Sequence, residues 1–487
     1  MKKLFLLLML VTIFIGTFTY SQAVAESKKE DAIADIVDKK ETDGEDSEQE
    51  EVAETEEGNT DIDKKDTLSK RSLTRSGTTR NLEIKRFYAR IKDGSIGEEL
   101  VSLPNSEYRV SYIHEGKEVF IHGKGTTNEK GEILNLPAIE IPAEVTQIRF
   151  RYYLGNEKRG YIKKYNNIVY QFVVGQNISS AGIINGYSNF WVGSATDPDR
   201  YFYNFQAAKL NYFYDESVKE FSDIVTKTNE LLPKTVPFNV EPINMYFEEG
   251  EYLDQNNGFW RNGHKGNKIA DITIADNSNR QIFNDRAIKS KVMHEWTHWN
   301  SWRETQRGQD KETAPPTIRN SYREGWAYLV GHMFADNYAY DSKDLIVQND
   351  NRNGVNRYYG RVSSMTAEHV LYDLLDVTSS DEDFSLSQRF IDDDLSELEQ
   401  RRINLGLMHT IMVESKATTL QEYLNYMENK YILTAADMKK YEKVLEVNGL
   451  NSDGSFKFNE DGSPLTKSSS SVQENEFEGT ACSEFVE

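Results

Sequence analysis

Hydrophobic and polar residues alternate with a period of two between about residues 80 and 174. Gly, Asn and Pro residues bound the alternating runs, which is typical of strands joined by tight turns. The runs are Leu82–Ile91, Tyr108–Ile113, Glu118–Ile121, Ala138–Ile141, Gln147–Leu154 and Ile168–Val174. The pattern predicts an all-β sandwich over residues 80–178, acting as a spacer, an adhesion module or a prodomain over a cleft.

The pattern becomes mixed over residues 179–448. Ser217–Leu232 has the spacing of an amphipathic helix, and Phe238–Phe247 has that of a strand. Helical periodicity returns over residues 365–447. The segments together predict an α+β domain, in which a mixed sheet is followed by a C-terminal helical subdomain.

Two shorter segments precede the central helix of this domain. Lys268–Asp276 is β-branched and alternating, so it predicts a strand at the edge of the sheet. Asn256–His264 has the Gly and Asn content of a loop, and His264 is expected to be an ordinary loop histidine.

The segment Asn284–Arg303 contains no helix breaker and carries the most specific motif of the chain. Its predicted buried stripe is Ile288, Val292, Trp296 and Trp299. The opposite side carries His294 and His298, four residues apart, with Glu295 beside the first. Side chains at this spacing stand about 6 Å apart at Cβ, so both imidazoles can reach one ion. This HExxH arrangement is typical of zinc hydrolases, in which the glutamate takes a proton from water at the metal.

A catalytic zinc usually takes three ligands from the protein, so a third is needed. The better candidate is Glu324, on a second predicted helix over residues 317–337. Ala327 and Gly331 lie near it on the same face and would allow the two helices to approach closely. Glu304 is the alternative, but a helix that continues past His298 would carry it away from the metal.

Three motifs together resemble the gluzincins, the thermolysin-like branch of zinc peptidases. They are His294-Glu295-Trp296-Thr297-His298, Glu324-Gly325-Trp326-Ala327 and the helical run Glu368–Asp376. The second is similar to the EGWA element of many secreted bacterial members, and the third to the Leu-Trp-Asp-Leu-x-Asp helix that often follows it. The resemblance covers about Ser180–Leu450.

The resemblance implies a zincin-like catalytic domain that hydrolyses peptide bonds. It assigns His294, His298 and Glu324 to one zinc ion and Glu295 to the general base. The donor to the oxyanion is left open between His332, Tyr328, His369 and Tyr372. In this family the extended substrate pairs with a sheet edge beside the active-site helix, the place predicted for Lys268–Asp276.

The chain departs from thermolysin at one position. Thermolysin has an Asp one turn after the third ligand, where it orients a metal-bound histidine, and Tyr328 occupies that position here. The orienting groups must therefore come from elsewhere, with Asn300, Asp373 and Asp376 as candidates.

Composition indicates export. A charged start, an apolar run and Ala23-Val24-Ala25 predict a signal peptide over residues 1–25, with an uncleaved anchor as the alternative.

Glu26–Arg75 holds 18 acidic and 9 basic residues, so residues 26–79 are expected to be an acidic disordered segment. One cysteine, Cys482, excludes an internal disulfide. Residues 449–487 are expected to form a loose acidic, Ser-rich tail, with turns at Asp453-Gly454 and Asp461-Gly462.

The net charge of −22 opposes nucleic-acid binding, and no EF-hand loop supports a Ca²⁺ site. We therefore expect a secreted, monomeric zinc endopeptidase, extracellular or associated with the cell wall, acting on proteins or peptides. The alternatives are a secreted binding or adhesion protein with a structural or inactive zincin domain, and a zinc hydrolase of other substrates. An intact Glu295 favours the enzyme, because a structural site needs no base.

Overall fold

The computed structural model describes most of the chain between residues 78 and 465. The described ranges are 78–92, 100–164, 167–191, 198–232, 236, 238–248, 259–261, 271–275, 285–305, 316–338, 360–376, 395–432 and 434–465. The predicted signal peptide, most of the acidic segment, His264 and Cys482 lie outside them.

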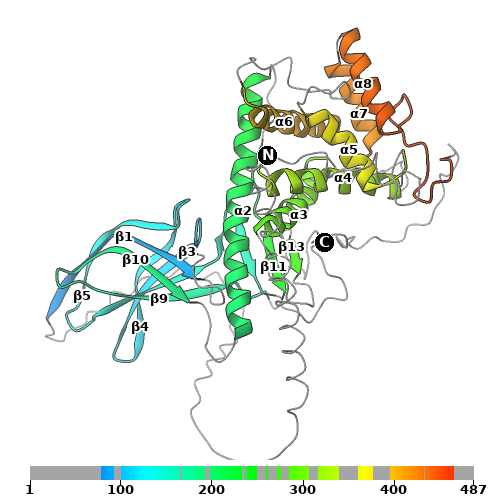
Figure 1. The fold of residues 1–487 in the computed structure, drawn as a ribbon. Coiled ribbons are helices and arrows are strands. Elements are labelled where there is room, and N and C mark those ends of the chain that lie inside the picture. The colour runs from blue at the N-terminus through cyan, green and yellow to red at the C-terminus, as the bar shows by residue number, and fades with distance from the viewer. Residues whose placement is uncertain are drawn as a thin grey trace, which may run out of the picture. The chain divides into compact units, whose positions relative to one another are not determined.

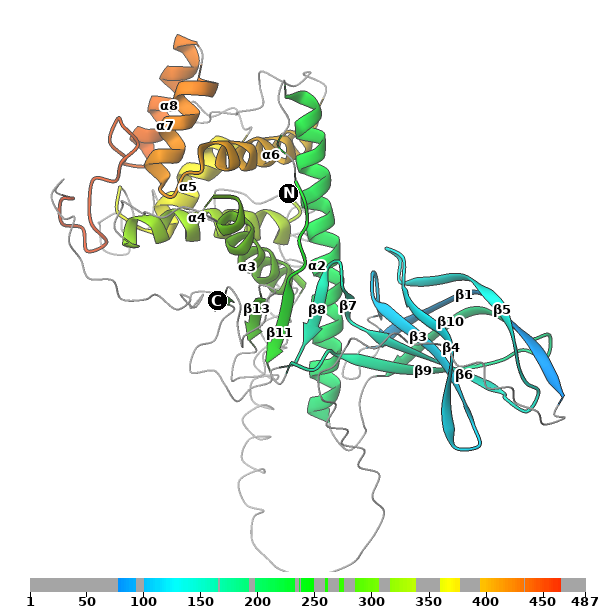
Figure 2. The same ribbon diagram turned by 180° about the vertical axis from the view of Figure 1, so that it is seen from behind.

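Two antiparallel-rich sheets form the predicted β-sandwich (Figures 1 and 2). One contains β1 (Thr79–Lys92), β2 (Leu100–Ser102), β5 (Glu132–Pro142) and β10 (Ile183–Trp191). The other runs in the order β4 (Lys117–Thr126), β3 (Glu107–His114), β6 (Gln147–Tyr153) and β9 (Gln171–Asn177). Inward residues of both sheets are buried, and the rings of Phe87 and Phe150 stack at 3.9 Å between centroids. The alternation of the sequence therefore places this core correctly.

The pairing of strands runs past the predicted boundary at residue 178. Strand β10 pairs in parallel with β1, with Glu83 opposite Ile183 and Lys92 opposite Trp191. Conversely, two strands that precede residue 178 do not belong to the sandwich. They are β7 (Gly155–Asn156) and β8 (Gly160–Lys163), which join a separate sheet with later strands. Period-two alternation finds strands but does not say which sheet each one joins.

The separate sheet is mixed and has the order β12-β13-β11-β8-β7. Its later strands are β11 (Asn244–Glu248), β12 (Phe259–Arg261) and β13 (Asp271–Ala275). β11 and β13 are parallel, whereas β12 pairs antiparallel with β13. Two predictions are therefore wrong in part. The strand expected at the edge is internal, and the expected loop contains the short strand β12 that takes that edge.

Helix α2 (Pro198–Leu231) is twice as long as the helix expected over Ser217–Leu232. Its N-terminal half has a run of consecutive buried residues from Phe205 to Leu210, so the amphipathic spacing is absent there. The cause is contact on more than one side, because α2 packs against β1, β2 and β8 as well as against α3 and α6.

The remaining helices confirm the sequence prediction of a helical C-terminal part. They are α3 (Asp285–Thr305), α4 (Pro316–Ala335), α5 (Ser364–Leu375), α6 (Glu397–Ser415), α7 (Leu420–Tyr431) and α8 (Ala435–Val447). Side chains cap the starts of α5, α6, α7 and α8, and Ser396 and Glu399 form a reciprocal capping box at α6. The chain thus has the predicted α+β class.

The predicted loose tail is wrong for residues 449–465. Leu450 and Phe456 are buried, and Phe458 makes isolated bridges to Arg361 and Pro464. The two expected turns are present, with positive φ at Gly454 and Gly462. The buried side chains of Leu450 and Phe456 anchor this segment. Among the described residues, no helix is both long enough and apolar enough to cross a membrane.

Candidate metal centre

Helix α3 presents His294 and His298 on one side, one turn apart. Their Nε2 atoms are 3.0 Å apart, and the two rings meet edge to face at 84°. The opposite stripe, which includes Trp296 and Trp299, is buried in the core. The predicted burial of the tryptophan stripe and the close approach of the two histidines are confirmed.

Helix α4 brings Glu324 to the same point. Its Oε2 atom lies 3.3 Å from Nε2 of His294 and 3.3 Å from Nε2 of His298. Ligand atoms of these three residues form a group that can hold a metal ion. The alternative ligand, Glu304, is instead paired with the neighbouring Arg303, so the structure selects Glu324.

The donor set and its dimensions suit a tetrahedral divalent ion. Zinc takes imidazole nitrogen and carboxylate oxygen at about 2.0–2.2 Å, which places tetrahedral ligand atoms about 3.4 Å apart. The three observed separations, 3.0, 3.3 and 3.3 Å, are close to that value. Three protein ligands leave a fourth position for water or substrate.

The charges of the group attract a cation, and one of its two imidazoles is neutral. Burial lowers the pKa of His294 to about 4, which leaves a neutral imidazole with a lone pair. Burial disfavours the charged forms of His298 and Glu324 as well, but their mutual attraction prevails. It raises the pKa of His298 and holds that of Glu324 below its usual range. Glu295, also buried, adds negative charge that acts on His298.

Two glycines allow α4 to approach its neighbours at this centre. A Cβ on Gly331 would lie 2.9 Å from the carbonyl oxygen of Ser290 on α3 and 3.4 Å from Cβ of His294. A Cβ on Gly325 would lie 2.8 Å from the amide nitrogen of Glu368 on α5. Gly331 thus fulfils the role predicted for a small residue near Glu324, and Gly325 adds a second close contact that was not predicted.

A histidine and a carboxylate form a buried pair beside the metal ligands. Nδ1 of His332 lies 2.6 Å from Oε1 of Glu368, whose side chain is fully buried. Tyr328 bridges this pair to the metal ligands, because its ring lies 4.6 Å from that of His294 and 6.1 Å from that of His332. The structure therefore brings together five of the predicted residues, His294, His298, Glu324, Tyr328 and His332.

The other predicted site residues have different surroundings. Tyr372 is part of the core, and His369 is buried, which lowers its pKa to about 3. Asn300 binds Arg303, Asp373 accepts from Asn448, and Asp376 accepts from Arg401. These contacts give no support to the predicted orienting role of the last three residues.

Glu368 was missed as a functional residue although it lies in the third motif. Its periodicity places it on the buried side of α5, where a carboxylate needs a partner. The need of a buried carboxylate for a partner could have indicated that Glu368 is paired. The sequence alone does not show that the partner is His332, 36 residues earlier on another helix.

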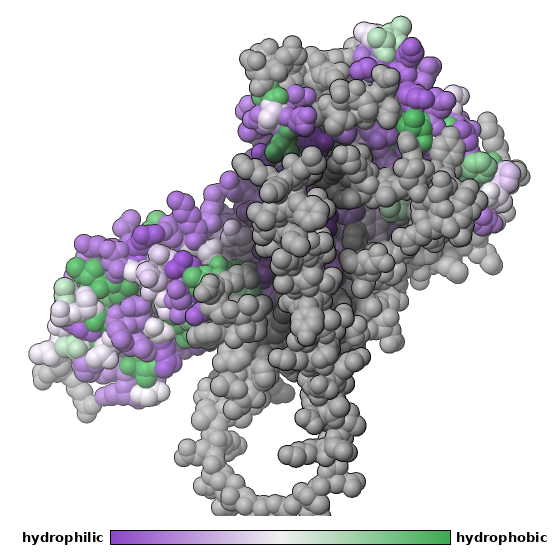
Figure 3. All heavy atoms as spheres, in the orientation of Figure 1, coloured by the Kyte–Doolittle hydropathy of each residue, from purple (hydrophilic) through white to green (hydrophobic). Residues whose placement is uncertain are grey.

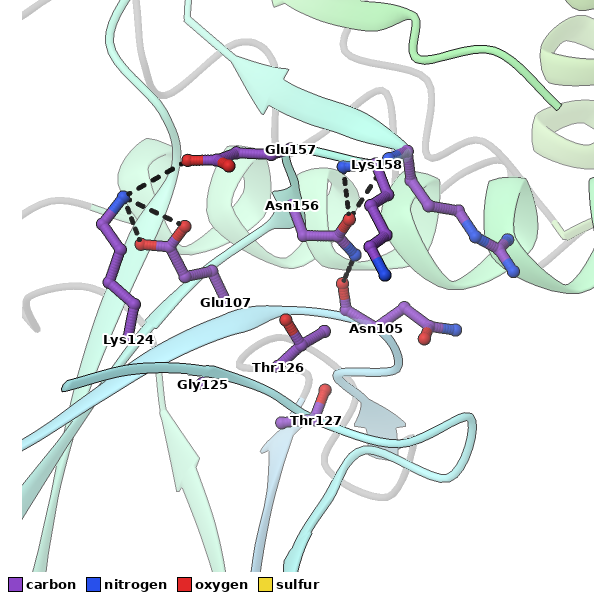
Figure 4. Close-up of a pocket in the computed structure, with 10 residues that line it drawn as sticks. Asn105, Glu107, Lys124, Gly125, Thr126, Thr127, Asn156, Glu157 and Lys158 are labelled. Carbon is purple, nitrogen blue, oxygen red and sulfur yellow. Dashed lines mark hydrogen bonds and ion pairs between the residues drawn. The ribbon is translucent and has the colours of Figure 1, made fainter. Parts of the chain in front are cut away.

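A separate polar hollow of about 450 Å³ lies near β3, β4 and β7 (Figure 4). Lys124 spans two carboxylates there, at 3.2 Å from Glu107 and 3.8 Å from Glu157. The amide of Asn156 donates to the carbonyl oxygen of Asn105 at 2.6 Å. The polar groups of this hollow pair with one another in ion pairs and hydrogen bonds. Such pairing is typical of polar contacts that stabilise the fold.

Comparisons with known proteins do not assign the chain. No family model matches it, and no characterised protein does. A solved structure, that of a 9R-lipoxygenase from Cyanothece PCC8801, aligns with 83% of this chain and 70% of its own, at 8% identity and a TM-score of 0.15. A likeness at that TM-score carries no argument.

Proposed function

We propose that the protein is a secreted zinc-dependent endopeptidase of gluzincin type. The observation that carries the proposal is the triangle of His294, His298 and Glu324, 3.0–3.3 Å on each side, with Glu295 buried beside it. The ligand set has nitrogen and oxygen donors only, which suits zinc.

Each residue of the site has a separate task. Zinc, when bound by the three ligands, would polarise a carbonyl group and lower the pKa of water. Glu295 would accept a proton from that water and later deliver it to the leaving amine. His332 would donate a hydrogen bond to the developing oxyanion through Nε2, with Tyr328 as the alternative donor.

The carboxylate of Glu368 gives His332 its orientation. A contact of 2.6 Å to Nδ1 indicates a proton on that atom, which Glu368 accepts. For the proposed role Nε2 must carry a proton as well, because a neutral ring with its proton on Nδ1 only accepts at Nε2.

The arrangement of elements supports a peptide substrate. Strand β12 is the edge of the mixed sheet and contacts α3, the helix of the metal ligands. An extended peptide could pair with this edge through its backbone, which gives affinity with little demand on sequence. This moves the substrate-binding strand from Lys268–Asp276 to β12. The apolar N-terminal sequence supports export, and we propose a monomer.

Two variants on neighbouring helices test the proposal. Glu295→Gln should abolish chelator-sensitive cleavage of casein, by about 10³-fold or more, while zinc stays near one per chain. Glu324→Ala should lose most of its zinc, as measured by metal analysis after dialysis. Glu304→Gln is the matched control on α3 and should keep both zinc and activity.

The same experiment separates the enzyme from the alternative of a binding protein with a structural zinc site. A wild-type protein that holds zinc but cleaves neither casein nor a peptide library would favour the alternative. Cleavage retained by Glu295→Gln would refute the assigned base.

A further inference from the structure

The outer face of β1 and β10 carries an ordered group of aromatic and basic side chains. On β1 the alternation buries Phe87 and Ala89 and turns Tyr88 and Arg90 to the outer face. The parallel register places Tyr187 of β10 opposite Tyr88, and Asn189 opposite Arg90. Two segments about 100 residues apart in sequence thus build one surface, here called the Tyr–Arg strip and defined by Tyr88, Arg90, Tyr187 and Asn189.

The side chains of the strip hold one another in place. The rings of Tyr88 and Tyr187 stack at 5.4 Å between centroids and 21° between planes. The guanidinium of Arg90 lies 5.5 Å from the first ring centroid and 5.2 Å from the second. Nε of Arg90 donates to Oδ1 of Asn189 at 3.0 Å. An arginine fixed in this way loses little conformational entropy when it binds a ligand.

Charge distinguishes Arg90 from its neighbour on the strand. Arg86, four residues earlier, is neutralised by a two-point contact with Glu132. In the part of the chain that the structure describes, no carboxylate pairs with Arg90. Its terminal N–H groups keep the fork geometry that matches a carboxylate or a phosphate.

Exposure shows that the strip faces solvent. Tyr187 is 56% exposed, a large value for an aromatic side chain. Figure 3 shows that hydrophobic residues on the sandwich lie scattered among hydrophilic ones. Tyrosine and arginine are also enriched at protein–protein interfaces, so the experiment must separate a polysaccharide from an acidic polypeptide.

The chemistry of the strip fits a sugar polymer with negative groups. Sugar C–H groups carry partial positive charge and stack on the negative face of an aromatic ring, and Tyr187 lies on an edge strand of its sheet. The amide of Asn189 and the tyrosine hydroxyls can bond sugar hydroxyls, and Arg90 can bind the anion. The net charge of −22 repels polyanions in general, so a local cation is needed for such a ligand.

We propose that the Tyr–Arg strip binds an anionic polysaccharide, with Arg90 contacting its carboxylate or phosphate groups and Tyr187 stacking on its sugar rings. This function is separate from hydrolysis at the metal centre. It would hold the enzyme on an acidic surface polymer.

Calorimetric titration of the full-length protein tests the proposal. The probes are polygalacturonate for carboxylate, phosphomannan for phosphate and dextran as the neutral polymer. A chelator is present throughout, so that binding is measured without metal exchange. We expect binding to at least one of the two anionic polymers and none to dextran.

Matched variants then locate the binding. Tyr187→Ala should weaken affinity about three- to tenfold, and Arg90→Gln about tenfold. The controls are Phe120→Ala, an exposed aromatic change on β4 of the other sheet, and Lys117→Gln, an exposed charge change on the same strand. Both controls should bind as the wild type does.

Three outcomes would overturn the proposal. The first is no binding of either anionic polymer by the wild type. The second is equal weakening in the control variants. The third is binding of polyglutamate as tight as that of the polysaccharide and insensitive to Tyr187→Ala, because the partner would then be an acidic polypeptide. None of these outcomes bears on zinc or on casein cleavage, so failure here leaves the proposed peptidase function untouched.

Discussion

At the scale of single residues, the metal centre depends on neutral and charged forms that its surroundings impose. Burial leaves His294 neutral, and Glu324 is kept ionised by the adjacent imidazoles. These two donors already have the charge that ligation needs, whereas the raised pKa of His298 means that it must lose a proton when a cation binds. The contact with Glu368 fixes the neighbouring ring of His332 in a similar way.

The first prediction concerns this pair. His332→Ala removes the proposed oxyanion donor, so kcat should fall about 10²–10³-fold while zinc content is unchanged. Glu368→Gln keeps an acceptor for Nδ1–H and should reduce kcat less than Glu368→Leu, which has none. Steady-state cleavage of a fluorogenic peptide measures these changes, and KM should change little.

A neighbouring residue provides the control for a purely structural effect. His369→Leu changes a buried histidine adjacent to Glu368 and leaves the pair intact. If all these variants lost activity in proportion to thermal stability, packing and not oxyanion stabilisation would explain the result. Should His332→Ala keep its kcat, Tyr328 would be the remaining donor next to the ligands.

The residues of the centre were predictable to different degrees. The spacing of His294 and His298 is local, so periodicity alone gives their shared face. Glu324 was predictable from the small residues around it. Glu368 was not, because its role depends on how α4 crosses α5, a tertiary property that no local pattern records.

At the scale of elements, the centre depends on the close approach of α4 to α3 and α5. Contacts at Gly331 and Gly325 leave no room for a methyl group. The carbonyl oxygen of Ser290, on the backbone of α3, cannot move aside like the end of a flexible side chain. Helix spacing therefore sets how far Glu324 lies from the histidines.

The second prediction follows from this spacing. Gly331→Ala should push α4 away from α3 and weaken zinc binding about tenfold or more, since ligand atoms must stay within a few tenths of an ångström. Alanine also favours the helix by about 1 kcal/mol, so unfolding stability should change much less than zinc affinity. Competition with a chromophoric chelator measures the affinity.

A glycine elsewhere provides the matched control. A Cβ on Gly123 of β4 meets nothing within 4 Å, so Gly123→Ala should bind zinc as the wild type does. Unchanged zinc affinity in Gly331→Ala would show that the helices adjust and that their spacing does not control the ligand geometry.

The bounds of a helix or strand could be predicted from the sequence where one of its faces packs on the core and the other faces solvent or the candidate site. The strands of the sandwich and the helices α3 and α4 satisfy that condition, and their positions agree with the sequence pattern. The first half of α2 contacts several elements, and β12 is too short for a period to show. Sheet order was beyond the pattern too, because pairing joins distant segments.

At the scale of the whole molecule, buried histidines link stability to pH. His409 on α6 is fully buried among Phe221 and Phe238, with ring centroids 5.2 and 5.4 Å away. Nδ2 of Asn300 lies 3.3 Å from its Nε2, and since an amide nitrogen only donates, Nε2 is the acceptor of a neutral ring. Burial lowers the pKa of His409 to about 3, with nearby Arg303 contributing.

The last prediction is the direction and source of acid destabilisation. A histidine with a pKa of about 3 when folded and about 6.5 when unfolded binds more protons in the unfolded state between those values. Its contribution to stability is therefore complete above pH 6.5 and is lost as pH falls toward 3, at about 1.4 kcal/mol per pH unit.

Urea unfolding of the metal-free protein between pH 7 and about 4.5, above most carboxylate titration, should show this loss. His409→Gln, which cannot be protonated, should reduce the slope by about one proton, whatever its effect on stability at pH 7. An unchanged slope would mean that acid acts through other groups, of which buried His369 is the first to replace in the same way.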